Sequence, residues 1–116
     1  LDCSAPEPTL QENKLIGVLT HHWSKPGQES AAIGILEGNG KAQSRAPGFV
    51  KRYSLTSLSV PSKISSLVIW DNNEIYDKWK TSPERKAAMY GAERLWDKPP
   101  ESERFTITKE ILSTKF

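Results

Sequence analysis

The sequence predicts an α+β fold in which the elements follow in the order β-α-β-β-α-β. Three observations support this prediction. Strand-forming residues are concentrated in four stretches, and two stretches with helical patterns separate the first strand from the second and the third from the fourth. The two middle strands are joined by only a short turn, which favours antiparallel pairing. We expect a four-stranded antiparallel sheet with both helices on one face, the ferredoxin-like arrangement.

The first half of the chain contains an arm, a strand and a helix. Residues 1–13 carry two prolines and show no periodicity, so they predict a flexible arm before a single domain at 14–116. Residues 14–24 are rich in strand formers, and a Lys-Pro-Gly turn follows them. Residues 28–43 predict a helix whose last turn is expected to end or fray at the glycines of Gly38-Asn39-Gly40.

The second half begins with two strands, at 49–58 and 64–70, which the turn Val60-Pro61-Ser62 separates. The following helix is predicted in two segments, 73–80 and 83–90. Asp71 is the expected cap of the first segment, and Ser82-Pro83 is a second start signal.

A last loop and strand complete the predicted sheet. Residues 92–103 contain Pro99-Pro100 and predict a loop, although Trp96 within it should fold back onto the domain. Residues 104–112 alternate as a fourth strand.

Helices on one face leave the other face of the sheet uncovered. The side chains expected there are apolar: Phe49, Tyr53, Leu55, Leu67 and Ile69. A monomer should not expose so large an apolar surface to water. We therefore expect a homodimer formed sheet against sheet.

Composition excludes several classes of protein. The net charge of +2 comes from interleaved acidic and basic residues, which argues against a nucleic-acid partner. No apolar run approaches the ~20 residues that a membrane helix requires.

The single cysteine, Cys3, allows no intrachain disulfide and is compatible with a cytoplasmic location. Because the chain begins with Leu1 rather than Met, we expect that an upstream segment was removed.

Two segments resemble a known family. APGF at 46–49 and VIWDNNEIYDKWKTSPERKAAM at 68–89 are similar to the antibiotic biosynthesis monooxygenase family of dimeric α/β-barrels. Its members often have a Pro-Gly-Phe turn before the second strand, and a tryptophan that ends the third strand ahead of an aromatic helix. The resemblance extends in element order from about Leu15 to Leu112. It implies a dimeric barrel with a cleft between sheet and helices.

The resemblance implies three chemistries. One branch of the family oxidises anthrone- or naphthol-type phenols to quinones without flavin or metal, and Trp70 and Tyr76 occupy its positions, with Ser66 in place of an asparagine. A haem-degrading branch uses a helix tryptophan, which Trp79 resembles, but Met89 stands where that branch has its axial histidine. Cyclases of polyketides use a histidine and a tyrosine, which His22 or His21 could supply with Tyr76.

We therefore predict a cleft that binds a small aromatic, polyketide-like substrate of secondary metabolism and uses no metal and no cofactor. A histidine that titrates near neutrality is the obvious base, and indole N–H and phenol O–H groups suit an oxyanion. The predicted catalytic residues are Trp70, Tyr76 and His22. The predicted substrate-binding residues are Ser66, Val68, Trp79, Arg85, Met89, Tyr90 and His21.

Alternatives remain open for residues and function alike. Trp70 and Trp79 also fit ordinary core positions, and Arg85 fits a solvated helix charge. The adjacent histidines face opposite sides of a strand, so only one of them can serve the cleft. His22 is favoured, because Trp23 fits the opposite, dimer-facing side. Oxygenation of a phenol to a quinone is the leading reaction. An aldol-type cyclase and a non-catalytic binder of an apolar ligand are the alternatives.

Overall fold

The structure, a computed structural model, describes residues 14–115, so the predicted arm at 1–13 lies outside the described residues. Its elements follow the predicted order, with the second helical region divided into two α-helices and a 3₁₀ helix, η1. They are β1 (Ile16–Ser24), α2 (Glu29–Gln43), β2 (Phe49–Thr56), β3 (Lys63–Trp70), α3 (Asn73–Lys80), α4 (Pro83–Ala88), η1 (Ala92–Leu95) and β4 (Trp96–Thr106).

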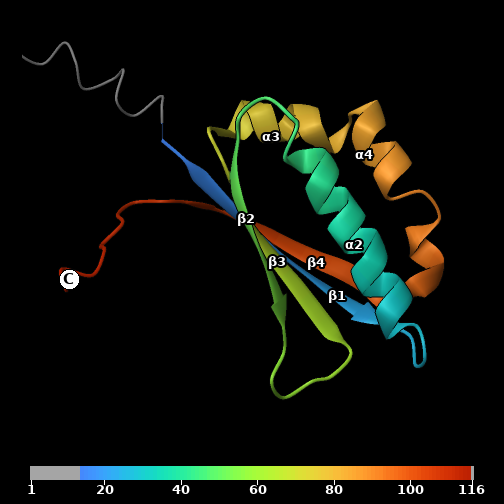
Figure 1. The fold of residues 1–116 in the computed structure, drawn as a ribbon. Helices are drawn as coiled ribbons and strands as arrows, with labels where there is room; N and C mark the ends of the chain where they lie inside the picture. Colours follow the sequence, from blue (N-terminus) through green and yellow to red (C-terminus); the bar gives the residue numbers. More distant parts are fainter. Residues whose placement is uncertain (1–13, 116) are drawn as a thin grey trace, which may run out of the picture.

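The four strands form one antiparallel sheet in the order β2-β3-β1-β4. The α-helices lie together on one side of it, and the opposite face carries no helix among the described residues (Figure 1). The predicted ferredoxin-like fold is confirmed. Strand register places side chains of all four strands in rows across the sheet, and these rows form the floor of the space beneath the helices.

The start of α3 differs from the prediction by one residue. Asn72, not Asp71, is the N-cap, and its Oδ1 accepts a hydrogen bond of 2.9 Å from the backbone N–H of Ile75. The second start signal is confirmed, since the Ser82 hydroxyl accepts from the Arg85 N–H and Pro83 stands in the first turn. The Ser82 cap starts a new helix directly after α3 and so fixes the bend between α3 and α4.

Helix α2 continues through Gly38-Asn39-Gly40, where we expected it to end or fray. The buried residues explain why, because they recur at helical spacing to the last turn. They are Ala32, Leu36, Asn39 and Gln43. Packing of this stripe against the sheet outweighs the low helix propensity of the glycines.

The fourth strand is the largest correction to the sequence prediction. β4 begins at Trp96 and includes the prolines that predicted a loop, whereas the expected strand at 104–112 overlaps it only at its end. Prolines are tolerated because β4 is an edge strand. They also lie at an irregularity: Trp23 pairs with Lys98 and His21 with Glu101, so β4 contains one extra residue there.

A second irregularity changes the face of Phe49. The register shifts between Phe49 and Lys51, and the Phe49 ring packs edge-on against Trp70, with centroids 5.7 Å apart. Phe49 therefore belongs to the core beneath the helices, not to the open face as predicted. Tyr53 and Leu55 do lie exposed, with 48% and 41% of their surface accessible, whereas Ile69 is buried.

Candidate active site

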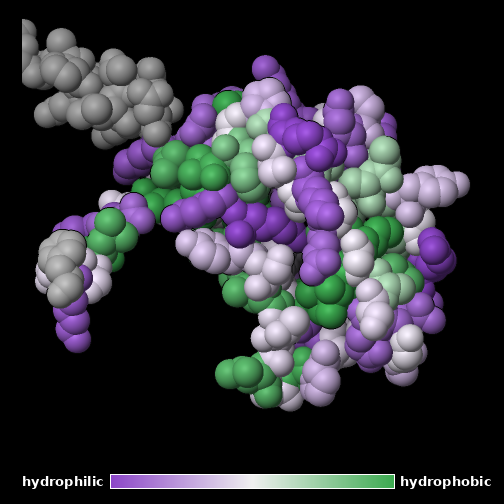
Figure 2. Space-filling model, viewed as in Figure 1, coloured by the Kyte–Doolittle hydropathy of each residue, from purple (hydrophilic) through white to green (hydrophobic). Residues whose placement is uncertain are grey.

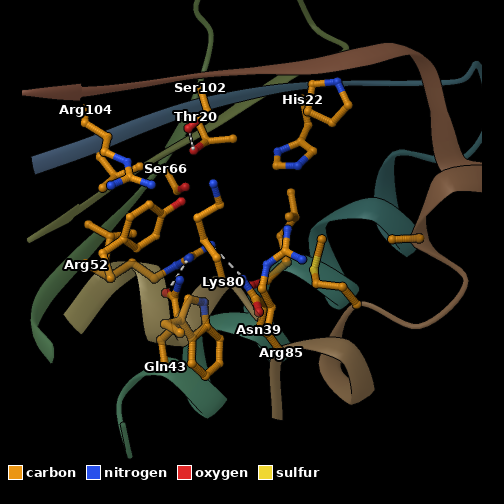
Figure 3. A pocket seen from close by; sticks show the side chains of 18 of the residues that line it. Thr20, His22, Asn39, Gln43, Arg52, Ser66, Lys80, Arg85, Ser102 and Arg104 are labelled. Atoms are coloured by element: carbon orange, nitrogen blue, oxygen red, sulfur yellow. Dashed lines mark hydrogen bonds between the residues drawn. The ribbon is translucent and has the colours of Figure 1, made fainter. Parts of the chain in front are cut away.

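A cavity of about 430 Å³ lies between the sheet and the helices. Its volume falls in the range of small-molecule sites. Side chains from the strands approach it from one side, and those from the helices approach it from the other (Figure 3). The polar side chains labelled there are Thr20, His22, Asn39, Gln43, Arg52, Ser66, Lys80, Arg85, Ser102 and Arg104.

Two rows of side chains across the sheet form the strand wall of the cavity. In the first, register aligns Arg52, Val68, Val18 and Arg104, so an arginine stands on each edge strand and valines fill the centre. In the second, the hydroxyls of Ser66, Thr20 and Ser102 lie side by side, and Thr20 Oγ1 is 3.0 Å from Ser102 Oγ.

The helix wall combines aromatic and cationic groups. Tyr76 and Lys80 share a face of α3 at a spacing of four residues, and Trp79 lies beside them. Arg85 on α4 adds a further positive charge, and Met89 follows that helix. The apolar surfaces of Trp79 and Trp96 suit a flat aromatic ligand.

His22 is the titratable group that the protein perturbs most clearly in this cavity. It is 7% exposed, and its ring packs on the indole of Trp96 with centroids 4.4 Å apart. Burial, and then the charges of Arg52, Arg85 and His21, lower the pKa of His22 from 6.5 to about 4. The imidazole is therefore neutral at pH 7 and able to accept a proton.

Tyr76 has the opposite protonation tendency. Burial raises the pKa of its phenol above the ordinary value, although Arg104 and Arg85 act to lower it. The Arg104 guanidinium lies 4.7 Å from the centre of the Tyr76 ring and is held there by Asp77, at 2.7 Å. Tyr76 thus carries its proton at neutral pH and can donate a hydrogen bond into the cavity.

The structure brings seven of the ten predicted site residues to the cavity wall. They are His22, Ser66, Val68, Tyr76, Trp79, Arg85 and Met89. Their predicted roles toward a substrate stay predictions. The preference for His22 over His21 agrees with the observed geometry, since His21 lies on the opposite face with its Nδ1 2.6 Å from Ser65 Oγ.

The other two predicted residues outside the wall are Trp70 and Tyr90. Trp70 is fully buried behind the wall, with its ring 5.9 Å from that of Tyr76 and 6.0 Å from that of Trp79. Its Nε1 is buried and has no hydrogen-bond partner among residues 14–115. Tyr90 is 85% exposed and borders a separate, shallow pocket.

Sequence reasoning missed several residues of the wall, and some of them had left a signal. Asn39 and Gln43 continue the stripe that Ala32 and Leu36 begin, so helical periodicity alone places them beneath α2. Ser102 and Trp96 were missed because the strand that holds them was read as a loop. Arg104 was assigned to a strand, but its position opposite Val18 depends on the register.

Neither a metal cluster nor a membrane-spanning helix is present within residues 14–115. No group of three or more His, Cys, Asp and Glu side chains in that range could hold a metal ion. None of the helices described there has the length and apolar character needed to cross a membrane.

Comparison with known proteins identifies the fold. No family model matches the sequence, and no curated protein matches it either. Solved structures do match. SnoaB, a cofactor-independent oxygenase from Streptomyces nogalater, has a TM-score of 0.76 at 13% identity, covering 86% of this chain and 99% of that one.

Two further structures, provisionally assigned as antibiotic biosynthesis monooxygenases, agree. One, from Nitrosomonas europaea, has a TM-score of 0.77 at 11% identity, covering 83% of this chain and 92% of its own. The other, from Chloroflexus aurantiacus, has a TM-score of 0.69 at 21% identity, with coverages of 84% and 96%. The fold that the sequence resemblance implies is thus confirmed: this chain has the fold of the antibiotic biosynthesis monooxygenases.

Proposed function

We propose that this protein is a cofactor-independent oxygenase that converts an anthrone-type polycyclic phenol to a quinone. One observation carries the proposal: a neutral imidazole, His22, and a protonated phenol, Tyr76, line the same cavity, to which the indoles of Trp79 and Trp96 add apolar surface. A base and a hydrogen-bond donor are what this chemistry requires of a protein, because the electron-rich substrate itself reduces O2. The fold shared with SnoaB, a cofactor-independent oxygenase, supports the proposal.

The reaction begins when His22 removes a proton from the CH₂ group of the anthrone. Tyr76 donates a hydrogen bond to the oxygen on which the negative charge develops. The resulting anion gives one electron to O2, and the two radicals combine to form a C–O bond.

The peroxide anion takes the proton back from His22. Loss of the second C–H proton with cleavage of the O–O bond then yields the carbonyl and water. One oxygen atom of O2 enters the quinone, the other leaves as water, and four electrons pass from carbon to oxygen.

The low pKa of His22 makes it a weak base in the empty cavity. A substrate anion between the imidazole and the arginines reverses part of this effect, because negative charge there favours the imidazolium. The base therefore gains strength as the substrate loses its proton. Stabilisation that appears only as charge develops is stabilisation of the transition state.

The proposal is tested with anthrone in metal-free buffer. We expect anthraquinone to form in air, with one O2 consumed for each anthrone, and no turnover under nitrogen. Turnover of a polyketide chain that proceeds equally well under nitrogen would support the aldol-type cyclase instead, since that reaction needs the same base and donor but no oxidant. A ligand that binds and is recovered unchanged in air would indicate a non-catalytic binder.

A homodimer through the open sheet face is part of the proposal. On this face or beside it, Tyr53, Leu55, Val50 and Phe105 each expose more than 40% of their surface. Hydrophobic side chains are also visible on the surface at the β2–β3 turn and where the chain leaves β4 (Figure 2). A second copy of the same sheet would cover these side chains with an equally apolar surface.

A further inference from the structure

The cavity has a strong excess of positive charge. Four cationic side chains line it, Arg52, Lys80, Arg85 and Arg104, against one carboxylate, Glu93. They come from four different elements, β2, α3, α4 and β4, so their convergence is a property of the fold and not of one charged helix face. Within residues 14–115, the ion pair found among these cations is that of Arg104 with Asp77.

Arg52 is held in place by neutral groups. Its Nη1 donates to Gln43 Oε1 at 2.8 Å and its Nη2 to the carbonyl oxygen of Leu36 at 3.2 Å. The guanidinium has five N–H donors, so others remain available for a ligand. These partners orient the cation without neutralising it. A partly buried charge is costly unless an opposite charge compensates it.

A glycine of α2 makes room for this arginine. A Cβ atom at Gly40 would lie 2.8 Å from Nε and 2.9 Å from Cδ of Arg52, which is too close for both to stay where they are. At Gly34 and Gly38 of the same helix, a Cβ would meet nothing within 4 Å. Gly40 therefore has a packing role in the site: it lets the guanidinium lie against the helix.

Arg85 faces the same space from the helix side. It lines the same cavity as His22 and Tyr76, the two groups to which we assign the chemistry, and its charge acts on both. Arg52 also acts on His22. Two guanidinium groups near one imidazole disfavour its protonated form. The same positive charge attracts an anion into the cavity. Arginine is well suited to such a site, because its planar donors match the two oxygens of a carboxylate.

We propose that the substrate is an aromatic carboxylate, whose acid group binds to Arg52 and Arg85 while its rings contact the apolar surfaces of Trp79 and Trp96. This inference rests on the proposed function only in treating the ligand as the substrate. The carboxylate neutralises the charge excess that the described residues leave uncompensated. It also orients the rings, because an acid fixed at the arginines sets which edge of the molecule approaches His22.

The test compares two probes that are already quinones and cannot be oxidised further at the ring: anthraquinone-2-carboxylate and the neutral anthraquinone-2-carboxamide. Binding is measured by calorimetry with the full chain. We expect the carboxylate to bind at least roughly tenfold more tightly, as charge-assisted hydrogen bonds imply. The preference should shrink as salt rises from 50 to 500 mM.

Variants locate the site of the preference. Arg52→Gln and Arg85→Gln should each reduce it to about threefold or less, whereas Arg45→Gln should retain it, because Arg45 lines a separate cleft. Gly40→Ala should also reduce it, since the methyl group displaces Arg52 without removing charge. Gly34→Ala is its matched control on the same helix. Should Arg52→Gln fail to fold, Arg85→Gln and the glycine pair decide.

Equal affinity for the two probes would overturn the inference, and so would a preference that falls equally in the Arg45 variant. Neither result depends on turnover, so the proposed oxygenase activity stands or falls separately. Consumption of O2 with neutral anthrone alongside equal binding of the two probes would leave an oxygenase without carboxylate selectivity. Carboxylate selectivity with no O2 consumption would leave the anion site and remove the reaction.

Discussion

The rings of Trp70 and Tyr76 lie with their centroids 5.9 Å apart, and only Tyr76 reaches the cavity. Trp70 is fully buried and also packs on Phe49 and Trp79. It can therefore affect a ligand in this cavity only through its neighbours. We interpret Trp70 as a positioning residue and Tyr76 as the group that touches the substrate.

Removal of the Tyr76 hydroxyl should affect catalysis more than folding. Tyr76→Phe is expected to lower kcat about 100-fold, the usual magnitude when one donor to a developing oxyanion is lost. Its KM should change little. Steady-state O2 consumption measures both parameters, and thermal unfolding serves as the control for the fold.

Trp70→Phe should show the reverse balance. The smaller ring leaves a void beneath Tyr76 and is expected to lower the free energy of unfolding by about 1–2 kcal/mol, partly offset because the unpartnered indole N–H is removed as well. Turnover should fall less than in Tyr76→Phe. A larger loss of kcat in Trp70→Phe, with unchanged stability, would contradict the positioning role.

Burial of neutral His22 predicts a pH-dependent stability. Its folded pKa, about 4, lies below the ordinary 6.5, so the unfolded chain takes up this proton first as the pH falls. The contribution is fully present above pH 6.5 and is lost between there and pH 4. By pH 5 the loss of stability should amount to about 2 kcal/mol. Urea unfolding at pH 7 and pH 5 measures it.

Two substitutions isolate the histidine responsible for this dependence. His22→Gln should remove most of the loss in stability between pH 7 and pH 5, whereas His21→Gln should retain it, because His21 is on the opposite face and bonded to Ser65. A wild-type and a His22→Gln protein with the same pH profile would show that His22 is not held neutral by the fold.

Gly48 lies in the turn before β2, where the backbone passes close to Ile75 of helix α3. Its φ is +82°, and a Cβ there would also lie 2.6 Å from Ile75 Cδ1. Gly27 has the same φ of +82° with nothing within 4 Å of a Cβ. Both alanine variants carry the backbone strain of about 1 kcal/mol, and only Gly48→Ala carries the clash as well. Gly48→Ala should therefore have the lower melting temperature.

The dimer proposal predicts a mass of twice the 13.0 kDa chain in sedimentation at micromolar concentration. Tyr53→Glu, on the open sheet face, should shift the protein toward one chain, because a charge cannot be buried unpaired between two sheets. Tyr90→Glu, exposed after α4, should leave the mass unchanged. A wild-type mass of one chain at every concentration would remove the dimer.

The element order and the faces of β1 and β3 were predictable from the sequence. Strand formers and two cap signals are local features, and alternation correctly separated His22 from His21. The fourth strand was not predictable in this way. Pro99-Pro100 normally ends a strand, and it is accommodated here because β4 lies at the sheet edge with an extra residue opposite β1.

The polar side of the cavity was also not predictable from local sequence, because it forms only when the strands are assembled into the sheet. Arg52 and Arg104 stand on the two edge strands, and only the sheet order and register bring them to one row. The interruption at Phe49 shows the limit of alternation, since one shift in register moved a ring from the open face into the core. Residues assigned by parity from a strand centre were placed correctly, and the residue beside the bulge was not.

The proposed role of His22 is that of the base for oxidation of an anthrone by O2. It is tested most directly by the rate of O2 consumption with anthrone in metal-free buffer, compared between His22→Gln and His21→Gln. We predict that His22→Gln lowers the rate by about 100-fold or more, the contribution expected of a general base, and that His21→Gln stays close to wild type. Equal rates in the two variants would contradict the claim.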